Sequence, residues 1–282
     1  MDEISFNQLS EFSEWPKRLL GLESFPDKIK TKKEIIREFE KENWGGLDKL
    51  SETQVSINID MVEEKYIPLS EINPFFYEGK FFIASNQEIL DKHLEVYSKV
   101  LAKYIKNSTA LIELGAGFGS KIIRLSQLDA FQNIPKYAAE LTSSGQNLIR
   151  KISKGMNIDI NVGQIDLHEF SISGIEIPKG GLIFTSYAAH YDNKMDKKFA
   201  EFLYSFRPYA VVNFEPCFEL YPQDSIHGEM CKKYILKNGY TKNIWSVVNQ
   251  FCLDHNLKFE FQRNTIGWNP FMPISILEWK KK

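Results

Sequence analysis

The chain lacks a disulfide framework and a cysteine-based metal site. Its three cysteines, Cys217, Cys231 and Cys252, are far apart and form no CxxC pair. Small secreted domains and zinc modules need close or paired cysteines, so these three are expected to be reduced thiols. No pair of His, Asp or Glu residues has metal-ligand spacing either, and the sequence predicts no metal site.

Long apolar runs and blocks of one charge are also missing. No run approaches the roughly 20 apolar residues that cross a bilayer. The acidic start of the chain lacks the basic and apolar parts of a signal peptide. The formal net charge is −2, and no run of lysine and arginine reaches the level of a nucleic-acid-binding patch, including the three lysines at the end of the sequence. These features predict a cytoplasmic protein with neither a membrane nor a nucleic acid as partner.

Apolar residues are plentiful, at 43% of 282 residues. That share supports a sizeable core. We expect an N-terminal, mainly helical extension over residues 1–84, followed by a core domain over residues 85–282. Within the extension, residues 27–44 have the composition of a surface helix that ends at Gly45 and Gly46.

The junction between extension and core carries two signals. Residues 61–82 contain Pro68, Pro74 and Gly79, which interrupt any long element, and are too aromatic for a free loop. Ser85 and Glu88 then form a capping-box pattern. Leucines and tyrosines follow at helical spacing as far as residue 104. A long helix is expected there.

Strands and helices alternate in the rest of the chain. Short apolar runs cover residues 110–114, 137–140, 158–162, 182–185, 210–214, 257–261 and 274–279. Helix-length segments separate the first five runs, which predicts parallel strands with helices on both faces of the sheet. The last two runs are too close for a crossover helix and are expected to pair antiparallel. The predicted fold is therefore α/β, with a seven-stranded, mostly parallel sheet and an antiparallel last strand.

The strongest motif follows the first of these strands. Glu113 precedes the loop Gly115-Ala116-Gly117-Phe118-Gly119, which leads into a helix. Glycines allow a tight turn and close approach of the backbone to a ligand, and a helix start offers free N–H groups. The motif resembles that of class I, Rossmann-like S-adenosylmethionine (SAM)-dependent methyltransferases. The resemblance covers about 170 residues, and beyond the loop it depends on topology more than on identities.

The resemblance implies SAM as cofactor and assigns residues to it. Glu140, at the end of the second strand, would accept hydrogen bonds from the ribose hydroxyls, and Asp166 would receive the adenine amino group. Glu113 would contact the methionine end or order the loop. Leu141, Leu167 and Ser186 complete the expected cofactor site with the glycine loop. The alternatives are a surface glutamate at position 140 and a turn-forming aspartate at position 166.

An NAD-binding fold is the main rival for this loop. Its fingerprint is GxGxxG, and Ser120 occupies the place of the last glycine. The antiparallel final hairpin also favours the methyltransferase. A third reading is a non-catalytic SAM-binding interaction module, since a fold does not prove a function.

Substrate residues are expected after the fourth and fifth strands, because ligands gather at the carboxyl ends of the strands. Aromatic residues and possible bases there could also be structural. The candidates are Tyr187, His190 and Tyr191 after the fourth strand, Glu215 and Glu219 after the fifth, and His227 beyond it. With Asp224, Glu229, Phe214, Phe218 and Tyr221, the two glutamates suggest a pocket for a flat or cationic group.

Two acceptor chemistries follow from these candidates. A nitrogen acceptor, an amino or guanidino group of a small molecule held by Glu215 and Glu219, is preferred. The alternative is an oxygen acceptor with His190 as catalytic base. The N-terminal extension is expected to be a lid, with Phe75, Phe76 and Tyr77 over the cofactor, or a homodimer interface. Those three aromatic residues could instead pack a helix onto the core.

Overall fold

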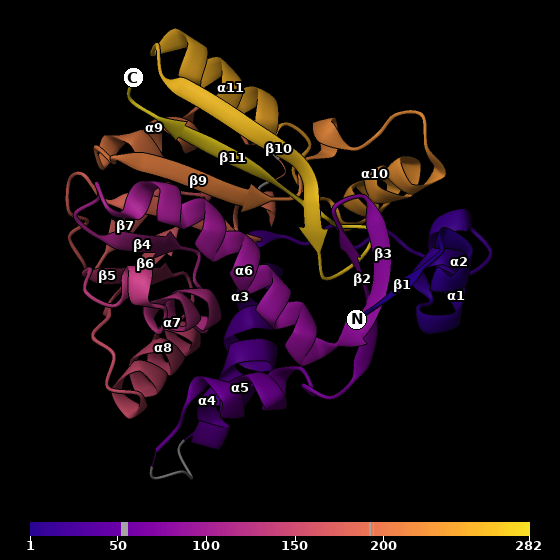
Figure 1. Cartoon of the computed structure of the whole chain (residues 1–282), viewed down its shortest axis with the longest axis horizontal. Coiled ribbons are helices and arrows are strands. Elements are labelled where there is room, and N and C mark those ends of the chain that lie inside the picture. The colour runs from indigo at the N-terminus through magenta and orange to yellow at the C-terminus, as the bar shows by residue number, and fades with distance from the viewer. Residues whose placement is uncertain (52–55, 192, 194) are drawn as a thin grey trace.

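The computed structural model describes residues 1–51, 56–191, 193 and 195–282 (Figure 1). These residues form one eleven-stranded mixed sheet with the strand order β1-β3-β2-β10-β11-β9-β8-β4-β5-β6-β7. The seven predicted core strands are β4 (Leu111–Leu114), β5 (Lys136–Glu140), β6 (Asn161–Asp166), β8 (Leu182–Ser186), β9 (Ala210–Glu215), β10 (Lys258–Gly267) and β11 (Ile274–Lys280).

The predicted topology of these seven strands is confirmed. Strands β6, β5, β4, β8 and β9 pair in parallel, and β11 pairs antiparallel with both β9 and β10. All four residues of β4 are buried, as expected for a central strand covered on both faces. The third strand begins at Asn161, three residues later than predicted, because the apolar run before it lies largely outside the ladder.

The sheet is wider than the seven strands predicted from the sequence. At one edge, β2 (Ile72–Tyr77) and β3 (Lys80–Ser85) form a hairpin, β1 (Asp2–Ile4) pairs with β3, and β2 pairs with β10. At the other edge, the short β7 (Ser171–Ser173) pairs with β6. The extension is therefore partly a β-structure joined to the core sheet.

The β2–β3 hairpin corrects the interpretation of residues 61–82 as interrupted. Glu78 and Gly79 both have positive φ, at 46° and 85°, and they join two aromatic strands in a two-residue turn. Such a turn matches the twist of the strands it connects. Pro74 is tolerated because β10 pairs with β2 only at Phe76 and Tyr77.

Helices cover both faces of the sheet because side chains alternate along each strand. One core lies under α6 (Asn86–Ile105), α7 (Ser120–Ser126) and α8 (Ser143–Gly155), and contains Leu111. The other lies under α9 (Lys198–Ser205) and α11 (Ile244–Asp254), and contains Ile112. The capping box of Ser85 and Glu88 at the start of α6 is confirmed. Residue 194, where a helix was predicted to begin before α9, lies outside the described residues.

A third apolar cluster joins the chain's start to α10 (Ile226–Asn238). It contains Leu9 of α1 (Leu9–Phe12), Leu19 of α2 (Trp15–Leu20) and Met230 of α10. The short 3-10 turns are η1 (Phe6–Gln8), η3 (Asp129–Phe131), η4 (Ala189–Tyr191) and η5 (Phe218–Leu220). No helix in the described part of the chain is long and apolar enough to span a membrane.

The predicted end of a helix at Gly45 and Gly46 is wrong. Helical structure runs through α3 (Lys32–Arg37), the π-helical segment η2 (Glu38–Asn43) and α4 (Trp44–Ser51), and α5 (Ile59–Tyr66) follows. A Cβ atom at Gly45 would lie 2.2 Å from the carbonyl oxygen of Glu40, so the π-helical turn requires glycine there. We call residues 32–51 the helical arm. In Figure 1, α4 and α5 lie beside α7 and α8, and the arm contacts α8.

Candidate functional site

The glycine loop after β4 is closely packed on both sides. Gly115 has a φ of 78°, and a Cβ atom there would lie 2.4 Å from the Cβ of Ala188, which follows β8. Gly117 has a φ of 57°, and its missing side chain leaves space that the Trp44 ring borders at 3.1 Å. Gly119 is the N-cap of α7. The loop thus needs glycine both for its backbone conformation and for close approach by neighbouring segments.

Glu113 is buried beneath this loop. Its carboxylate accepts a hydrogen bond from the backbone N–H of Ile122 at 3.1 Å, and its exposed fraction is 1%. Burial raises the pKa of Glu113 to about 7, while the nearby Lys121 and the Ile122 N–H act in the opposite direction. In this structure Glu113 orders the turn between β4 and α7, which is one of the two roles expected of it.

Glu113→Gln is expected to flatten the pH dependence of stability. The folded-state pKa lies above the ordinary value of 4.5. The contribution of the Glu113 carboxyl group to stability is therefore fully present below pH 4.5, and it is lost as the pH rises through about 7. Glutamine cannot ionise. The free energy of unfolding of the variant, relative to that of the parent, should therefore rise by roughly 3 kcal/mol from pH 4 to pH 8. Urea denaturation at both pH values tests this, and an unchanged difference between the two proteins would contradict it.

Glu140 connects the end of β5 to the glycine loop. One carboxylate oxygen accepts the Gly117 N–H at 2.9 Å, and the other accepts the backbone N–H of Thr142 at 3.1 Å and its hydroxyl at 2.8 Å. Burial raises the pKa of Glu140, although these hydrogen bonds favour the charged form. The carboxylate lines a cavity with Gly115, Gly117 and Leu141. The sequence prediction placed it correctly at the end of its strand, beside the loop.

Asp166 forms the turn after β6, the alternative that the sequence left open. Its carboxylate accepts the N–H groups of His168 and Glu169 at 3.0 and 3.1 Å. Its other oxygen lies 2.6 Å from the ammonium of Lys32 in the helical arm. Burial opposes ionisation, but Lys32 and the two N–H groups hold the pKa of Asp166 below its ordinary value. Asp166 is not among the residues that line the cavity, whereas the adjacent Leu167 is.

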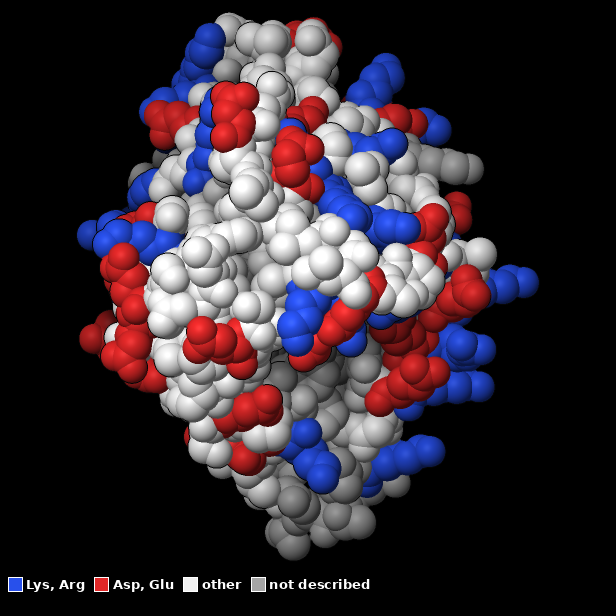
Figure 2. Space-filling model, turned by 90° about the vertical axis from the view of Figure 1, so that its right-hand side faces the viewer, with Lys and Arg blue, Asp and Glu red and all other residues white. Residues whose placement is uncertain are grey.

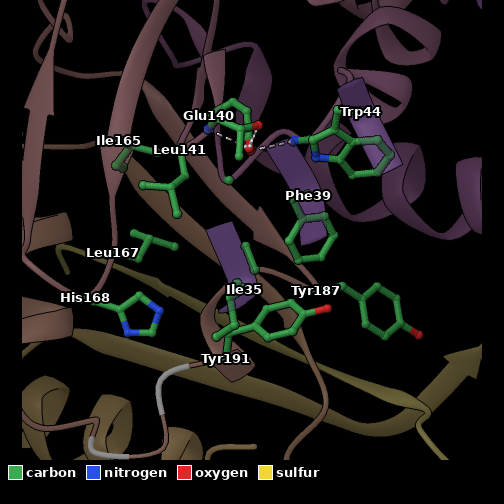
Figure 3. Close-up of a pocket in the computed structure, with 14 residues that line it drawn as sticks. Ile35, Phe39, Trp44, Glu140, Leu141, Ile165, Leu167, His168, Tyr187 and Tyr191 are labelled. Atoms are coloured by element: carbon green, nitrogen blue, oxygen red, sulfur yellow. Dashed lines mark hydrogen bonds between the residues drawn. The ribbon is translucent and has the colours of Figure 1, made fainter. Parts of the chain in front are cut away.

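The cavity beside Glu140 lies between the sheet and the helical arm, and it measures about 120 Å³. Figure 3 shows Leu141, Ile165 and Leu167 on one side and Phe39 and Trp44 on the other. We call this space the inner cavity. Its walls are mostly apolar, and its polar lining includes Glu140, Thr142, His168 and the glycine loop. Mostly apolar walls with a few polar groups are usual for small-molecule sites.

A second space, the outer cavity, adjoins the inner cavity and measures about 360 Å³. The two share the glycine loop and the side chains of Phe39, Trp44, Tyr187 and Tyr191. Ser186, at the end of β8, lines the outer cavity and its hydroxyl is 2.9 Å from the Tyr97 hydroxyl. The structure thus brings three of the predicted residues, Ser186, Tyr187 and Tyr191, to one cavity.

The sequence did not predict that the helical arm forms a wall of the cavities. Trp44 is 8% exposed, stacks on Phe39 at 5.6 Å and contacts Phe118 edge to face at 5.1 Å. The pair of aromatic residues Phe39 and Trp44, in a segment otherwise rich in charged residues, is the sequence signal that could have identified this wall. Trp268 of the β10–β11 loop also lines the outer cavity and was not predicted.

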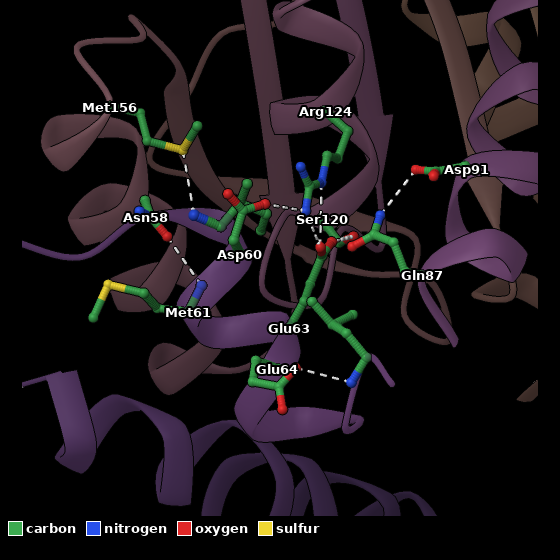
Figure 4. Close-up of polar contacts among 12 residues, drawn as sticks. Asn58, Asp60, Met61, Glu63, Glu64, Gln87, Asp91, Ser120, Arg124 and Met156 are labelled. Atoms are coloured by element: carbon green, nitrogen blue, oxygen red, sulfur yellow. Dashed lines mark hydrogen bonds and ion pairs between the residues drawn. The ribbon is translucent and has the colours of Figure 1, made fainter. Parts of the chain in front are cut away.

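Helix α5 is held against the core by ion pairs with Arg124 of α7. Figure 4 shows Arg124 of α7 between Asp60 and Glu63 of α5. Glu63 is fully buried and also accepts a hydrogen bond from Ser120. Because an unpaired buried carboxylate is very costly, this pairing fixes α5 against the start of α7.

His190 and Glu215 lie behind the cavities and line neither of them. The Glu215 carboxylate accepts the N–H groups of Ala188 and Ala189, both at 3.1 Å, and lies 3.5 Å from the His190 ring. Both residues are at most 1% exposed. Glu215 therefore shapes the segment after β8 that meets Gly115, and the structure does not bring the His190 ring to the cavity as a base.

The remaining acidic residues of the predicted pocket do not converge. Glu219 accepts the N–H groups of Trp245 and Ser246 at the start of α11. Asp224 and Glu229 lie on an outer groove next to α10, and Glu229 pairs with Lys232. These acidic residues are close in sequence but lie in different parts of the structure, because the chain turns after β9 and their side chains point in different directions.

The aromatic residues predicted as a lid lie in the sheet extension. Phe75 and Phe76 are buried in β2, and the Phe76 ring stacks on His227 at 5.0 Å. Tyr77 contacts the Lys92 ammonium at 5.1 Å, and His227 is bonded to the Pro270 carbonyl at 2.7 Å. None of these residues lines the inner or outer cavity. They have the packing role that the sequence left as the alternative.

The surface charge is mixed. On the face that Figure 2 shows, basic and acidic side chains alternate across the described residues. Within the described parts of the chain, no three His, Cys, Asp or Glu side chains lie close enough together to hold a metal ion.

Comparisons with known proteins identify the fold. No protein-family model and no curated protein matches the sequence. Magnesium protoporphyrin IX methyltransferase from Synechocystis PCC 6803, with bound SAH (S-adenosylhomocysteine), is similar in structure, with a TM-score of 0.54 and 13% identity over 89% of this chain and 100% of that one. An O-methyltransferase family protein from Burkholderia thailandensis gives a TM-score of 0.47 and 11% identity over 70% of this chain and 59% of that one. Geranyl diphosphate C-methyltransferase from Streptomyces coelicolor A3(2) gives a TM-score of 0.46 and 9% identity over 68% of this chain and 80% of that one.

Proposed function

We propose that this chain, which has the fold of class I SAM-dependent methyltransferases, is itself an enzyme that transfers the methyl group of SAM to a small molecule. The observation that carries the proposal is the junction of Glu140 with the glycine loop. A carboxylate at the end of β5 lies within hydrogen-bonding distance of the Gly117 N–H, at the edge of a cavity with apolar walls. A carboxylate suits the two adjacent hydroxyls of a ribose.

The inner cavity would hold the nucleoside part of the cofactor. Glu140 would accept hydrogen bonds from the ribose, and Leu141, Ile165 and Leu167 would contact the adenine ring. The loop from Gly115 to Gly119 and Ser186 would then border the methionine part, which extends into the outer cavity. There the acceptor would meet the methyl group. In-line displacement from a sulfonium depends mainly on such positioning.

The nitrogen acceptor preferred from the sequence has no support in the positions of its two carboxylates. That preference required Glu215 and Glu219 to bind a cationic group. Their carboxylates instead accept backbone N–H groups, of Ala188 and Ala189 for the first and of Trp245 and Ser246 for the second. An oxygen acceptor activated by His190 is not supported either, because the ring lies outside both cavities.

Trp44→Ala is expected to weaken SAH binding by about 10- to 100-fold, since anchoring aromatic residues contribute more than 1 kcal/mol at binding sites. The ring covers Gly117 and forms part of both cavities. Trp44→Phe keeps a ring at this position and should retain most of the affinity. Calorimetric titration of SAH into the three proteins, after circular dichroism has established folding, measures the effect. Equal affinity in all three would show that the helical arm does not cover the cofactor.

Transfer of labelled methyl groups tests the proposed function itself. The full chain is incubated with S-adenosyl-L-[methyl-¹⁴C]methionine and small-molecule fractions of a cell extract, with Gly117→Arg as the matched control. We expect label in an extractable product with the parent protein only. If the protein binds SAM but no fraction accepts the label, the non-catalytic interaction module gains support and the enzyme proposal fails.

A further inference from the structure

The outer cavity has mainly aromatic walls. Seven rings, from five separate parts of the chain, border it: Phe39, Trp44, Tyr66, Phe118, Tyr187, Tyr191 and Trp268. Tyr66 contacts both Trp44 and Phe118, at 5.2 and 5.5 Å between ring centroids. Rings from several elements that converge on one space favour a flat, apolar ligand with little freedom of orientation.

The cavity contains one charged side chain without an ion pair among the described residues. Of its lining residues only Glu63 and Lys121 carry charge. Glu63 pairs with Arg124, which also pairs with Asp60, and accepts a hydrogen bond from Ser120. The structure records no ion pair for the Lys121 ammonium with any described residue, and Asp91, which borders an adjoining hollow with Lys121, instead accepts a hydrogen bond from Gln87. Lys121 is therefore the cation that the outer cavity offers to a ligand, although the buried Glu113 lies near enough to interact with its charge.

The described lining residues include no side chain suited to remove a proton from an acceptor. Burial raises the pKa of the Tyr66, Tyr187 and Tyr191 hydroxyls, so these groups keep their protons at neutral pH. The Tyr187 hydroxyl also donates to the carbonyl of Met272 at 3.3 Å. His190 and His227 lie outside the cavity. An acceptor bound here must therefore present a nucleophile that already has a free lone pair, and a carboxylate is such a group that the Lys121 ammonium can also bind.

We propose, on the basis of the methyltransferase function proposed above, that the acceptor is an aromatic carboxylic acid whose carboxylate pairs with Lys121. A carboxylate oxygen would attack the methyl carbon of the sulfonium. The new bond is oxygen to carbon, the broken bond is carbon to sulfur, and the bonding electrons remain on sulfur. The negative carboxylate and the positive sulfonium become a neutral methyl ester and neutral SAH. No proton is transferred, which agrees with a cavity that lacks a base.

Three indole compounds of similar shape and different charge provide the test. Indole-3-acetate is an anion, indole-3-acetamide is neutral and tryptamine is a cation. Saturation-transfer NMR on the full chain saturated with SAH compares their binding. We expect the acid to bind at least about tenfold more tightly than the amide, since a hydrogen bond between two charged groups is stronger than one to a neutral group. Tryptamine should be the weakest ligand.

Variants of Lys121 assign this preference to one side chain. Lys121→Gln should lose the preference for the acid, and Lys121→Arg should retain it. Lys99→Gln, an exposed position on α6, is the matched control and should behave as the parent. Tighter binding of the amide or amine, no binding of the acid, or an unchanged preference in Lys121→Gln would each overturn the proposal.

Titrations of SAH and 5′-methylthioadenosine separate this inference from its premise. The second compound lacks the amino-acid part of the cofactor. If Lys121→Gln weakens SAH binding but not 5′-methylthioadenosine binding, Lys121 pairs with the cofactor's own carboxylate and the acceptor proposal is wrong. If the parent protein binds neither compound, the proposed function fails first, whatever the indole compounds do.

Discussion

Glu140→Ala is expected to weaken SAH binding by at least about 100-fold. The variant loses a carboxylate that would accept two ribose hydroxyls, and hydrogen bonds to a charged group contribute about 1.5–3 kcal/mol each. It also loses the bond that holds the Gly117 N–H. Isothermal titration calorimetry on the parent and the variant measures the change directly.

Two controls make the Glu140 result specific. Glu140→Gln keeps one acceptor oxygen and should fall between the parent and the alanine variant. Glu201→Ala removes an exposed carboxylate on α9 whose recorded ion-pair partner in the described part of the chain is Lys197, and it should leave SAH binding unchanged. If Glu140→Ala bound SAH as tightly as the parent, the ribose would not lie at the end of β5, and the orientation of the cofactor proposed above would be wrong.

Arg124→Met is expected to destabilise the protein by about 3–5 kcal/mol, the usual cost of leaving a buried charge without its partner. Arg124 pairs with Glu63, a residue that is fully buried. The ion pair connects α5 to α7, so its loss should also loosen the elements that border the outer cavity. Urea denaturation at neutral pH measures the free energy of unfolding.

The double variant Glu63→Met/Arg124→Met distinguishes an unpaired charge from lost packing. Removing both partners eliminates the buried carboxylate, so the double variant should recover most of the stability that Arg124→Met loses. If the double variant were as unstable as the single one, the contribution of Arg124 would come from its contacts with the apolar core and not from its charge.

The core topology could be predicted because it depends on local patterns. The alternation of apolar runs with helical segments predicted the five parallel strands, and the short gap before residue 274 predicted the antiparallel pair of β10 and β11. The loop around Gly117 and the place of Glu140 followed from residue type and spacing. In each case a few neighbouring residues contain the whole signal.

Features that depend on distant contacts could not be predicted in this way. The Glu78-Gly79 hairpin was hidden because Pro74 and Gly79 were read only as breaks, although β2 joins the sheet at an edge where proline is tolerated. Gly45 was read as a helix end because nothing in the local sequence shows that the Glu40 carbonyl would need its space.

The acidic residues after β9 show the same limit in the site. Their closeness in sequence suggested one binding pocket, but a carboxylate can also satisfy backbone N–H groups, and Glu215 and Glu219 do so. Conversely, Trp44 borders Gly117, and Phe39 lines the same cavities, although both lie more than 70 positions earlier in the chain. Only the packing of the helical arm against the sheet brings these residues to the loop.

Calorimetric titration of SAH into the full-length protein, with NAD⁺ as the comparison ligand, tests the central claim most directly. The account predicts saturable binding of SAH at one site per chain and no heat of binding for NAD⁺ beyond dilution. An absence of heat with SAH in folded protein, or saturable binding of NAD⁺ in its place, would contradict it.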